Sequence, residues 1–246
     1  MMQDTPVAPG HGTFPRKRFP DIRPDGCPWD PGLHIGRIAP IIGLPAIHRR
    51  PHAYPRRMNA VSQPQRYLIN VEQYHKMGAA GVFPDDARVE LIEGELLSMA
   101  PMGMPHIWAV ATLTRALLES PLGRHIFLLP QLPILLSDIT EPQPDLVLAR
   151  LPAEKYRTAR VTAEDVVLLI EVSDSTLSFD RKRKMQLYAR HAIAEYWILN
   201  VRDRQLEVHH TPANGTYSTV SPVLPGTTVC LQAFPDLPLD WSVALT

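Results

Sequence analysis

The sequence is poor in cysteine and in long apolar runs, and each shortage excludes a class of protein. Its two cysteines, Cys27 and Cys230, lie far apart and form no CxxC spacing. Neither a zinc site nor a disulfide framework is therefore expected, and a reducing cytoplasm is the simplest setting. No stretch approaches the ~20 apolar residues that span a bilayer, and the first residues lack the apolar core of a signal peptide. We expect a cytoplasmic protein with no membrane partner.

The chain also lacks net charge, because 25 basic residues balance 25 acidic ones. The whole molecule is therefore no electrostatic attractor for nucleic acid or membranes. A local basic patch can still hold a phosphate backbone, so nucleic acid is not excluded as a partner. The charge is uneven, since residues 1–57 carry nine Lys and Arg against four Asp and Glu.

Proline, in contrast, is abundant in residues 1–57, which hold 11 of the chain's 26 prolines. Each proline removes a backbone donor, and no helical or alternating period is found there. We expect a disordered or loosely packed extension, or a segment upstream of an authentic start at Met58. A basic nucleic-acid-binding arm is the less favoured alternative. Residues 58–246 are expected to form a single domain.

Regular patterns begin after Met58 and predict an α/β fold with a mixed central sheet flanked by helices. Helices are expected at 68–78, 106–120 and 179–191 from their apolar spacing and from Gly78 as a terminator. Strands are expected at 144–150, 165–174 and 194–201, with extended chain at 125–136 where prolines favour an edge position. Two hairpins are expected, one within 88–101 and an additional C-terminal one at 204–220.

Two acids lie on neighbouring predicted strands. Asp145 opens "PDLVLAR", and Glu171 lies near the end of "DVVLLIEVSD", a strand apolar enough to be buried on both faces. Ser173 shares the face of Glu171 because side chains alternate along a strand. Two converging carboxylates raise each other's pKa unless a cation lies between them. Mg²⁺ or Mn²⁺ suits such a site and could activate water on a phosphoester.

The predicted helix at 179–191 places Asp180, Lys184, Tyr188 and His191 on one stripe. An ordinary Asp180–Lys184 surface pair would explain this spacing. Lys184 could equally turn toward the two acids, where an ammonium would orient water or stabilise a developing oxyanion. The spacing does not decide between these interpretations.

Four segments in order, "RVELIEGELLSMAPMGMPH", "EPQPDLVLAR", "LLIEVSDSTLSFDRKRKMQLYARHAIAEYWIL" and "AFPDLPL", together resemble the Uma-two family of bacterial endonucleases. That family belongs to the PD-(D/E)XK nuclease superfamily, and the similarity covers roughly residues 64–240. The resemblance implies a restriction-endonuclease-like core with a divalent-metal site, so that residues 58–246 would be a nuclease-like domain. Homodimers are common in this superfamily, which makes a homodimer an expectation by analogy.

The resemblance also implies roles for particular residues. It matches the metal-binding Asp to Asp145, the second acid to Glu171 and a further acid, completing the cluster, to Glu90. The usual superfamily lysine would stand at Ser173, and the family's lysine on the following helix matches Lys184. Accessory positions match Tyr188 and His106. Among the other residues, Trp197 is expected in the core and His209 and His210 at the surface.

The expected activity is that of a Mg²⁺- or Mn²⁺-dependent endonuclease, a hydrolase of phosphodiester bonds with DNA as the favoured substrate. Glu90, Asp145, Glu171 and Lys184 are the expected catalytic residues. Two other interpretations stay open. One is a non-catalytic nucleic-acid- or partner-binding module that keeps the fold, and the other is a metal-dependent hydrolase of a smaller phosphoester.

Overall fold

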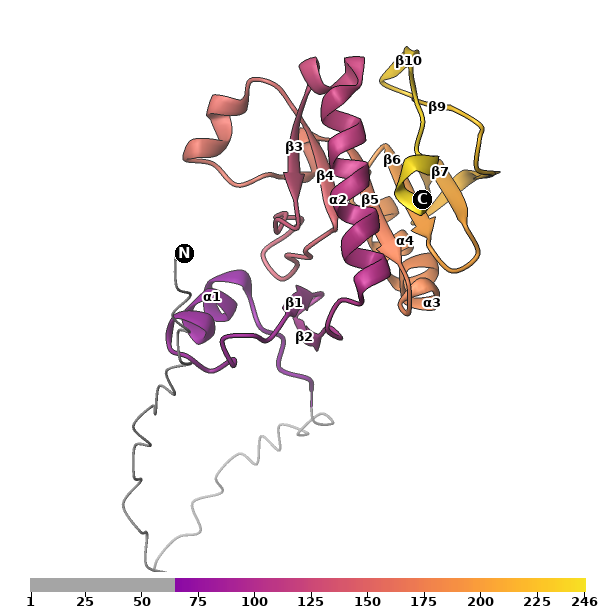
Figure 1. Cartoon of the computed structure of the whole chain (residues 1–246). Helices are drawn as coiled ribbons and strands as arrows, with labels where there is room; N and C mark the ends of the chain where they lie inside the picture. Colours follow the sequence, from indigo (N-terminus) through magenta and orange to yellow (C-terminus); the bar gives the residue numbers. More distant parts are fainter. Residues whose placement is uncertain (1–64) are drawn as a thin grey trace, which may run out of the picture. The chain divides into compact units, whose positions relative to one another are not determined.

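The computed structural model describes residues 65–246 (Figure 1). The extension expected at 1–57, and the alternative start at Met58, lie outside these residues, and the domain limits stay predictions. Among the described residues, no helix combines the length and the apolarity needed to cross a membrane.

A six-stranded mixed sheet forms the centre of the fold, in the order β3-β4-β5-β6-β7-β8. The strands span Ile126–Pro130, Leu146–Arg150, Val166–Ser173, Glu195–Asn200, Gln205–Ala213 and Thr216–Val223. Only the β5–β6 pair is parallel within this sheet. Every residue of β5 is buried, as expected for an apolar central strand covered on both faces. This confirms the expected α/β class with a mixed sheet.

Helices cover both faces of the sheet. On one face, α2 (Met104–Glu119) packs Leu113 and Leu117 into a core that contains Ile170 of β5. On the other face, α4 (Met185–Arg190) packs Leu187 against Leu169 of β5. Residues 174–194, which include α4, connect β5 to the parallel strand β6, and this crossover segment lies on the same face of the sheet as α4.

A smaller element lies beside the sheet and consists of α1 (Val71–Ala79) and the antiparallel pair β1 (Val89–Ile92) and β2 (Glu95–Ser98). The turn between β1 and β2 is formed by Glu93 and Gly94, which both have positive φ, at 53° and 79°. Such a turn matches the twist of a hairpin. A Cβ on Gly94 would lie 2.6 Å from the Cβ of Leu68, so this position requires glycine. The predicted hairpin about Glu93-Gly94 is confirmed.

Several predicted boundaries were wrong. The segment expected as one helix at 179–191 comprises α3 (Leu177–Phe179), a π-helical turn (Asp180–Lys184) and α4. The hairpin expected at 204–220 is present as β7–β8 and extends the central sheet. A second small sheet, β9 (Val229–Leu231) with β10 (Phe234–Leu239), was not predicted. Short 3₁₀ helices span Pro121–Arg124, Ala153–Arg157, Ala163–Asp165 and Ser242–Leu245.

Trp197 is fully buried as predicted, whereas the prediction that His209 lies at the surface was wrong. His209 on β7 packs between the rings of Tyr196 and Tyr217. Its neighbour on the same face, Glu207, accepts hydrogen bonds from Arg181 Nε at 2.9 and 3.1 Å. This ion pair joins the π-helical turn to β7.

We expect the Glu207–Arg181 contact to make stability depend on pH. Burial raises the pKa of the Glu207 carboxyl, but contacts with His209 and Arg181 outweigh it and lower the pKa from 4.5 to about 2. A lowered pKa stabilises the fold above pH 4.5, and this contribution is lost as the pH falls from 4.5 toward 2. Because Arg181 is 43% exposed, we expect Glu207→Gln to cost only about 1 to 2 kcal/mol at pH 7.

Urea denaturation of wild type and Glu207→Gln from pH 7 to pH 3 measures this contribution. The difference in unfolding free energy should fall by roughly half or more at pH 3. A difference that stays constant over this range would contradict the assignment.

Candidate active site

Asp145 lies directly before β4 and faces the end of β5. Its Oδ2 accepts hydrogen bonds from the backbone N–H of Val172 at 2.9 Å and from His106 Nε2 at 3.0 Å. Burial raises the pKa of the Asp145 carboxyl, but His106, Val172 and Lys184 outweigh burial and lower it. These contacts favour the carboxylate form of Asp145, and α2 positions it through the first-turn residue His106.

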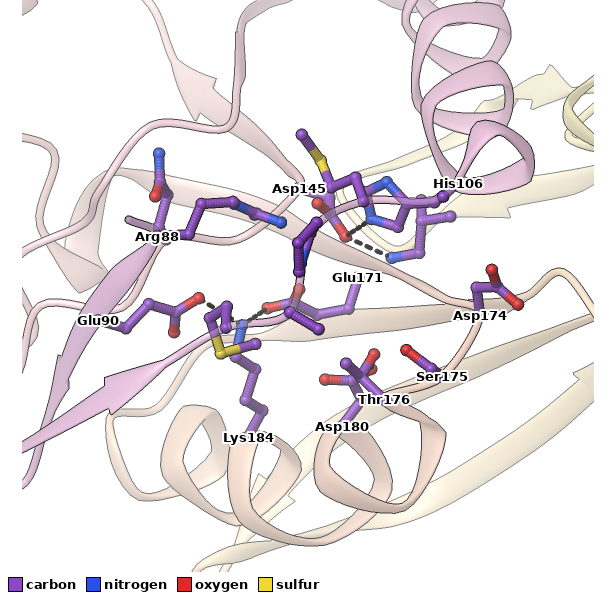
Figure 2. A pocket seen from close by; sticks show the side chains of 17 residues that line it. Arg88, Glu90, His106, Asp145, Glu171, Asp174, Ser175, Thr176, Asp180 and Lys184 are labelled. Atoms are coloured by element: carbon purple, nitrogen blue, oxygen red, sulfur yellow. Dashed lines mark hydrogen bonds and ion pairs between the residues drawn. The ribbon is translucent and has the colours of Figure 1, made fainter. Parts of the chain in front are cut away.

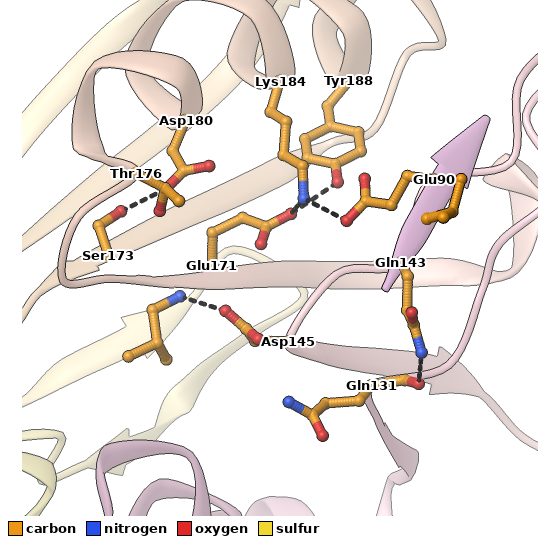
Figure 3. A network of polar contacts seen from close by, with 12 residues as sticks. Glu90, Gln131, Gln143, Asp145, Glu171, Ser173, Thr176, Asp180, Lys184 and Tyr188 are labelled. Atoms are coloured by element: carbon orange, nitrogen blue, oxygen red, sulfur yellow. Dashed lines mark hydrogen bonds and ion pairs between the residues drawn. The ribbon is translucent and has the colours of Figure 1, made fainter. Parts of the chain in front are cut away.

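Glu171 lies within β5 and is 4% exposed. Its Oε1 accepts hydrogen bonds from Lys184 Nζ at 2.9 Å and from the Tyr188 hydroxyl at 2.7 Å (Figure 3). Burial raises the pKa of the Glu171 carboxyl, and the ammonium of Lys184 lowers it. The carboxylates of Asp145, Asp180 and Glu90 raise this pKa further. The crossover segment thus supplies both hydrogen-bond partners of Glu171, Lys184 from the π-helical turn and Tyr188 from α4.

Lys184 is 1% exposed and lies between two acids, because its Nζ also contacts Glu90 Oε1 at 3.2 Å. Burial lowers the pKa of the ammonium, but Glu171 and Glu90 outweigh burial and raise it above 10.5. An ammonium has three donors and two are used here. Of the two interpretations of Lys184, the structure shows the one in which it faces the acids, and no Asp180–Lys184 ion pair is formed within residues 65–246.

Glu90 reaches this cluster from β1, where the alternation of the strand separates it from Glu93. Glu93 instead pairs with Arg190 at the surface, and Glu95 pairs with Arg183. These contacts join the hairpin to the crossover segment, whereas Glu90 is 2% exposed. The choice of Glu90 among the three glutamates therefore agrees with its position.

Ser173 occupies the position at which the superfamily lysine is expected, but it does not contact Glu171. Its hydroxyl donates to Asp180 Oδ2 at 2.6 Å, and Thr176 Oγ1 donates to the same oxygen at 2.6 Å. Burial raises the pKa of the Asp180 carboxyl. Ser173 therefore positions Asp180, a buried acid next to the cluster.

One cavity with a volume of about 50 Å³ is lined by Glu90, His106, Asp145, Glu171, Asp180 and Lys184 (Figure 2), and Ser173 and Tyr188 are not part of its lining. One water needs about 10 to 15 Å³ of such volume, so the cavity has room for a few waters or for an ion. Its carboxylates outnumber its two cationic side chains, Lys184 and Arg88. The carboxylates come from Glu90, Asp145, Glu171, Asp174 and Asp180.

The donor set suits a hard divalent ion. Within residues 65–246, no hydrogen bond reaches Asp145 Oδ1 or Glu171 Oε2, and Glu90 Oε2 is buried without a partner. No group of three His, Cys, Asp or Glu side chains in this part of the chain is arranged to hold an ion by itself. Mg²⁺ commonly uses one or two carboxylates and completes its shell with water and substrate phosphate, so Asp145 and Glu171 fit it.

Comparison with known proteins agrees with this fold, which is similar to that of a nuclease. The family Uma2, described as "Putative restriction endonuclease", matches residues 71–244, and the chain belongs to this family. A crystal structure titled "a putative nuclease belonging to DUF820", from Anabaena variabilis, superposes with a TM-score of 0.53 at 15% identity. The match covers 72% of this chain and 97% of that one. No protein with a curated description matched the sequence.

Six residues that the sequence predicts for the site meet in this cluster, and two further residues of the cluster were not predicted. Asp180 shares the predicted helical stripe with Lys184 and Tyr188, a usable signal, but the spacing leaves open whether it only pairs with Lys184. Arg88 was not considered, although it lies two residues before Glu90 and therefore on the same strand face. The predicted residues that meet here are Glu90, His106, Asp145, Glu171, Lys184 and Tyr188, with Ser173 behind Asp180.

Proposed function

We propose that this protein is a divalent-metal-dependent endonuclease that hydrolyses phosphodiester bonds, with DNA as its substrate. One observation carries the proposal: Asp145 and Glu171 each direct an oxygen that lacks a protein donor toward one cavity, beside the buried ammonium of Lys184. Membership of a restriction-endonuclease family supports the reaction class.

In this proposal Asp145 and Glu171 would hold Mg²⁺ or Mn²⁺, and a bound ion would supply an activated water and neutralise charge on the phosphate. Glu90 holds Lys184 in place and completes the acidic cluster. The third N–H of Lys184 orients the attacking water or stabilises the phosphoryl oxygens as their charge develops. His106 fixes the Asp145 carboxylate, and Tyr188 fixes that of Glu171. A homodimer and a cytoplasmic location stay predictions.

Nicking of supercoiled plasmid DNA with Mg²⁺ or Mn²⁺ tests the proposal. We expect Asp145→Asn and Glu171→Gln each to lower the rate by ~10²-fold or more, because each removes a charged oxygen from the cavity without changing side-chain size. Glu119→Gln, which changes an acid paired with Arg115 on the exposed face of α2, should cleave like wild type. Cleavage at the wild-type rate by both site variants would refute the assignment.

A non-catalytic binding module is the second candidate, and one contact favours it. Lys184 already pairs with one oxygen each of Glu90 and Glu171, so the protein itself supplies a cation to these two acids. This candidate predicts nucleic-acid binding without cleavage and without divalent-ion binding.

A further inference from the structure

Arg88 precedes β1 and is held in the register of the hairpin. The backbone N–H of Met99 donates to the carbonyl oxygen of Arg88 at 2.8 Å, which extends the β1–β2 pairing by one residue. Alternation places Arg88 on the strand face of Glu90, and a rise of about 3.3 Å per residue puts their Cα atoms roughly 6 to 7 Å apart. The strand therefore presents a cation and an acid side by side.

The side chain of Arg88 lines the same cavity as the acidic cluster and points toward Asp145 (Figure 2). It is half-buried. Within residues 65–246, no hydrogen bond or ion pair involves its guanidinium. The other arginines around the hairpin behave differently, because Arg66 and Arg183 pair with Glu95 and Arg190 pairs with Glu93.

The guanidinium of Arg88 is unpaired although acids line the same cavity. The nearby carboxylates have other donors: Asp145 accepts from His106 and Val172, and Glu171 accepts from Lys184 and Tyr188. A guanidinium offers five N–H donors in a planar fork that fits two oxygens of one phosphate. Arg88 thus has the geometry and the free donors to bind an anion that enters the cavity.

We propose that Arg88 binds a backbone phosphate of duplex DNA at the mouth of the active-site cavity. The inference rests on the proposed function and adds a substrate-binding residue to it. The chemistry is recognition of a phosphodiester by a fixed guanidinium, which supplies affinity and register without reading the base sequence. The rival explanation is that Arg88 only offsets the charge of the acidic cluster.

Binding of a fluorescent DNA duplex to the full-length protein in EDTA, followed from 50 to 200 mM KCl, separates these explanations. A phosphate contact releases counterions, so Arg88→Ala should weaken binding about tenfold and reduce the slope of log affinity against log salt by about one. Arg88→Lys should keep the slope, because the charge remains, but recover only part of the affinity. Arg190→Ala, which removes the partner of Glu93, should keep the wild-type slope.

The outcomes distinguish this inference from the proposed function. An Arg88→Ala protein that is folded and binds with the wild-type slope overturns the role of Arg88, even if plasmid nicking occurs. A reduced slope in Arg88→Ala without metal-dependent nicking by wild type retains the phosphate contact and refutes the nuclease. Wild-type protein that does not bind the duplex overturns the role of Arg88.

Discussion

Replacing Lys184 by Met is expected to destabilise the fold by about 3 to 5 kcal/mol and to abolish cleavage. Lys184 is buried between Glu90 and Glu171, and removing one side of a buried ion pair leaves the other charges without compensation. Methionine fills a similar volume, so the loss reports charge more than packing. Urea denaturation measures the change in unfolding free energy, and plasmid nicking measures activity.

A triple variant separates the two effects of Lys184. Adding Glu90→Gln and Glu171→Gln to Lys184→Met removes the uncompensated charges, so most of the lost stability should return. Cleavage should not return, because the variant lacks both the Glu171 carboxylate and the Lys184 ammonium. Lys184→Met that unfolds like wild type would contradict the buried pairing. If that variant cleaved at the wild-type rate, Lys184 would have no part in the reaction.

The acids on the strands could be predicted from sequence because local pattern determines their surroundings. The apolar run of β5 requires burial, so Glu171 needed a partner inside the protein. Alternation alone separated Glu90 from Glu93, but it could not show which of them lies in the buried acidic cluster. The other two glutamates pair instead with Arg183 and Arg190, which are about 90 residues later in the chain and therefore beyond local pattern.

Other features lay beyond local pattern. The residues of the π-helical turn at Asp180–Lys184 are equally compatible with an α-helix, so local pattern does not predict the turn. Its tertiary contacts are those of Lys184 with the acids and of Arg181 with Glu207. His209 was expected at the surface because no ligand pattern surrounds it, yet the rings of Tyr196 and Tyr217 enclose it. Likewise, the free guanidinium of Arg88 is recognisable only once the donors to its neighbouring acids are known.

Divalent ions are expected to stabilise the folded protein, which tests the metal site without measuring catalysis. The cavity holds more carboxylates than cations, so an ion that binds there relieves repulsion in the folded state alone. At a Mn²⁺ concentration 100 times its Kd, the free energy of unfolding should rise by about 2.7 kcal/mol. Denaturation with and without MnCl₂, at ionic strength matched with KCl, measures the gain.

Variants locate this gain in the cavity. Asp145→Asn and Glu171→Gln should each lose most of the stabilisation, because each removes a charged oxygen ligand. Glu72→Gln alters an exposed acid that pairs with Lys76 on α1, and it should keep the full gain. If wild type gains nothing from Mn²⁺, Lys184 is the only cation the acids require, and the binding module becomes the better explanation. If the gain depends on Asp145 and Glu171, the Lys184 pair leaves room for an ion, and the carboxylate oxygens without protein donors are its ligands.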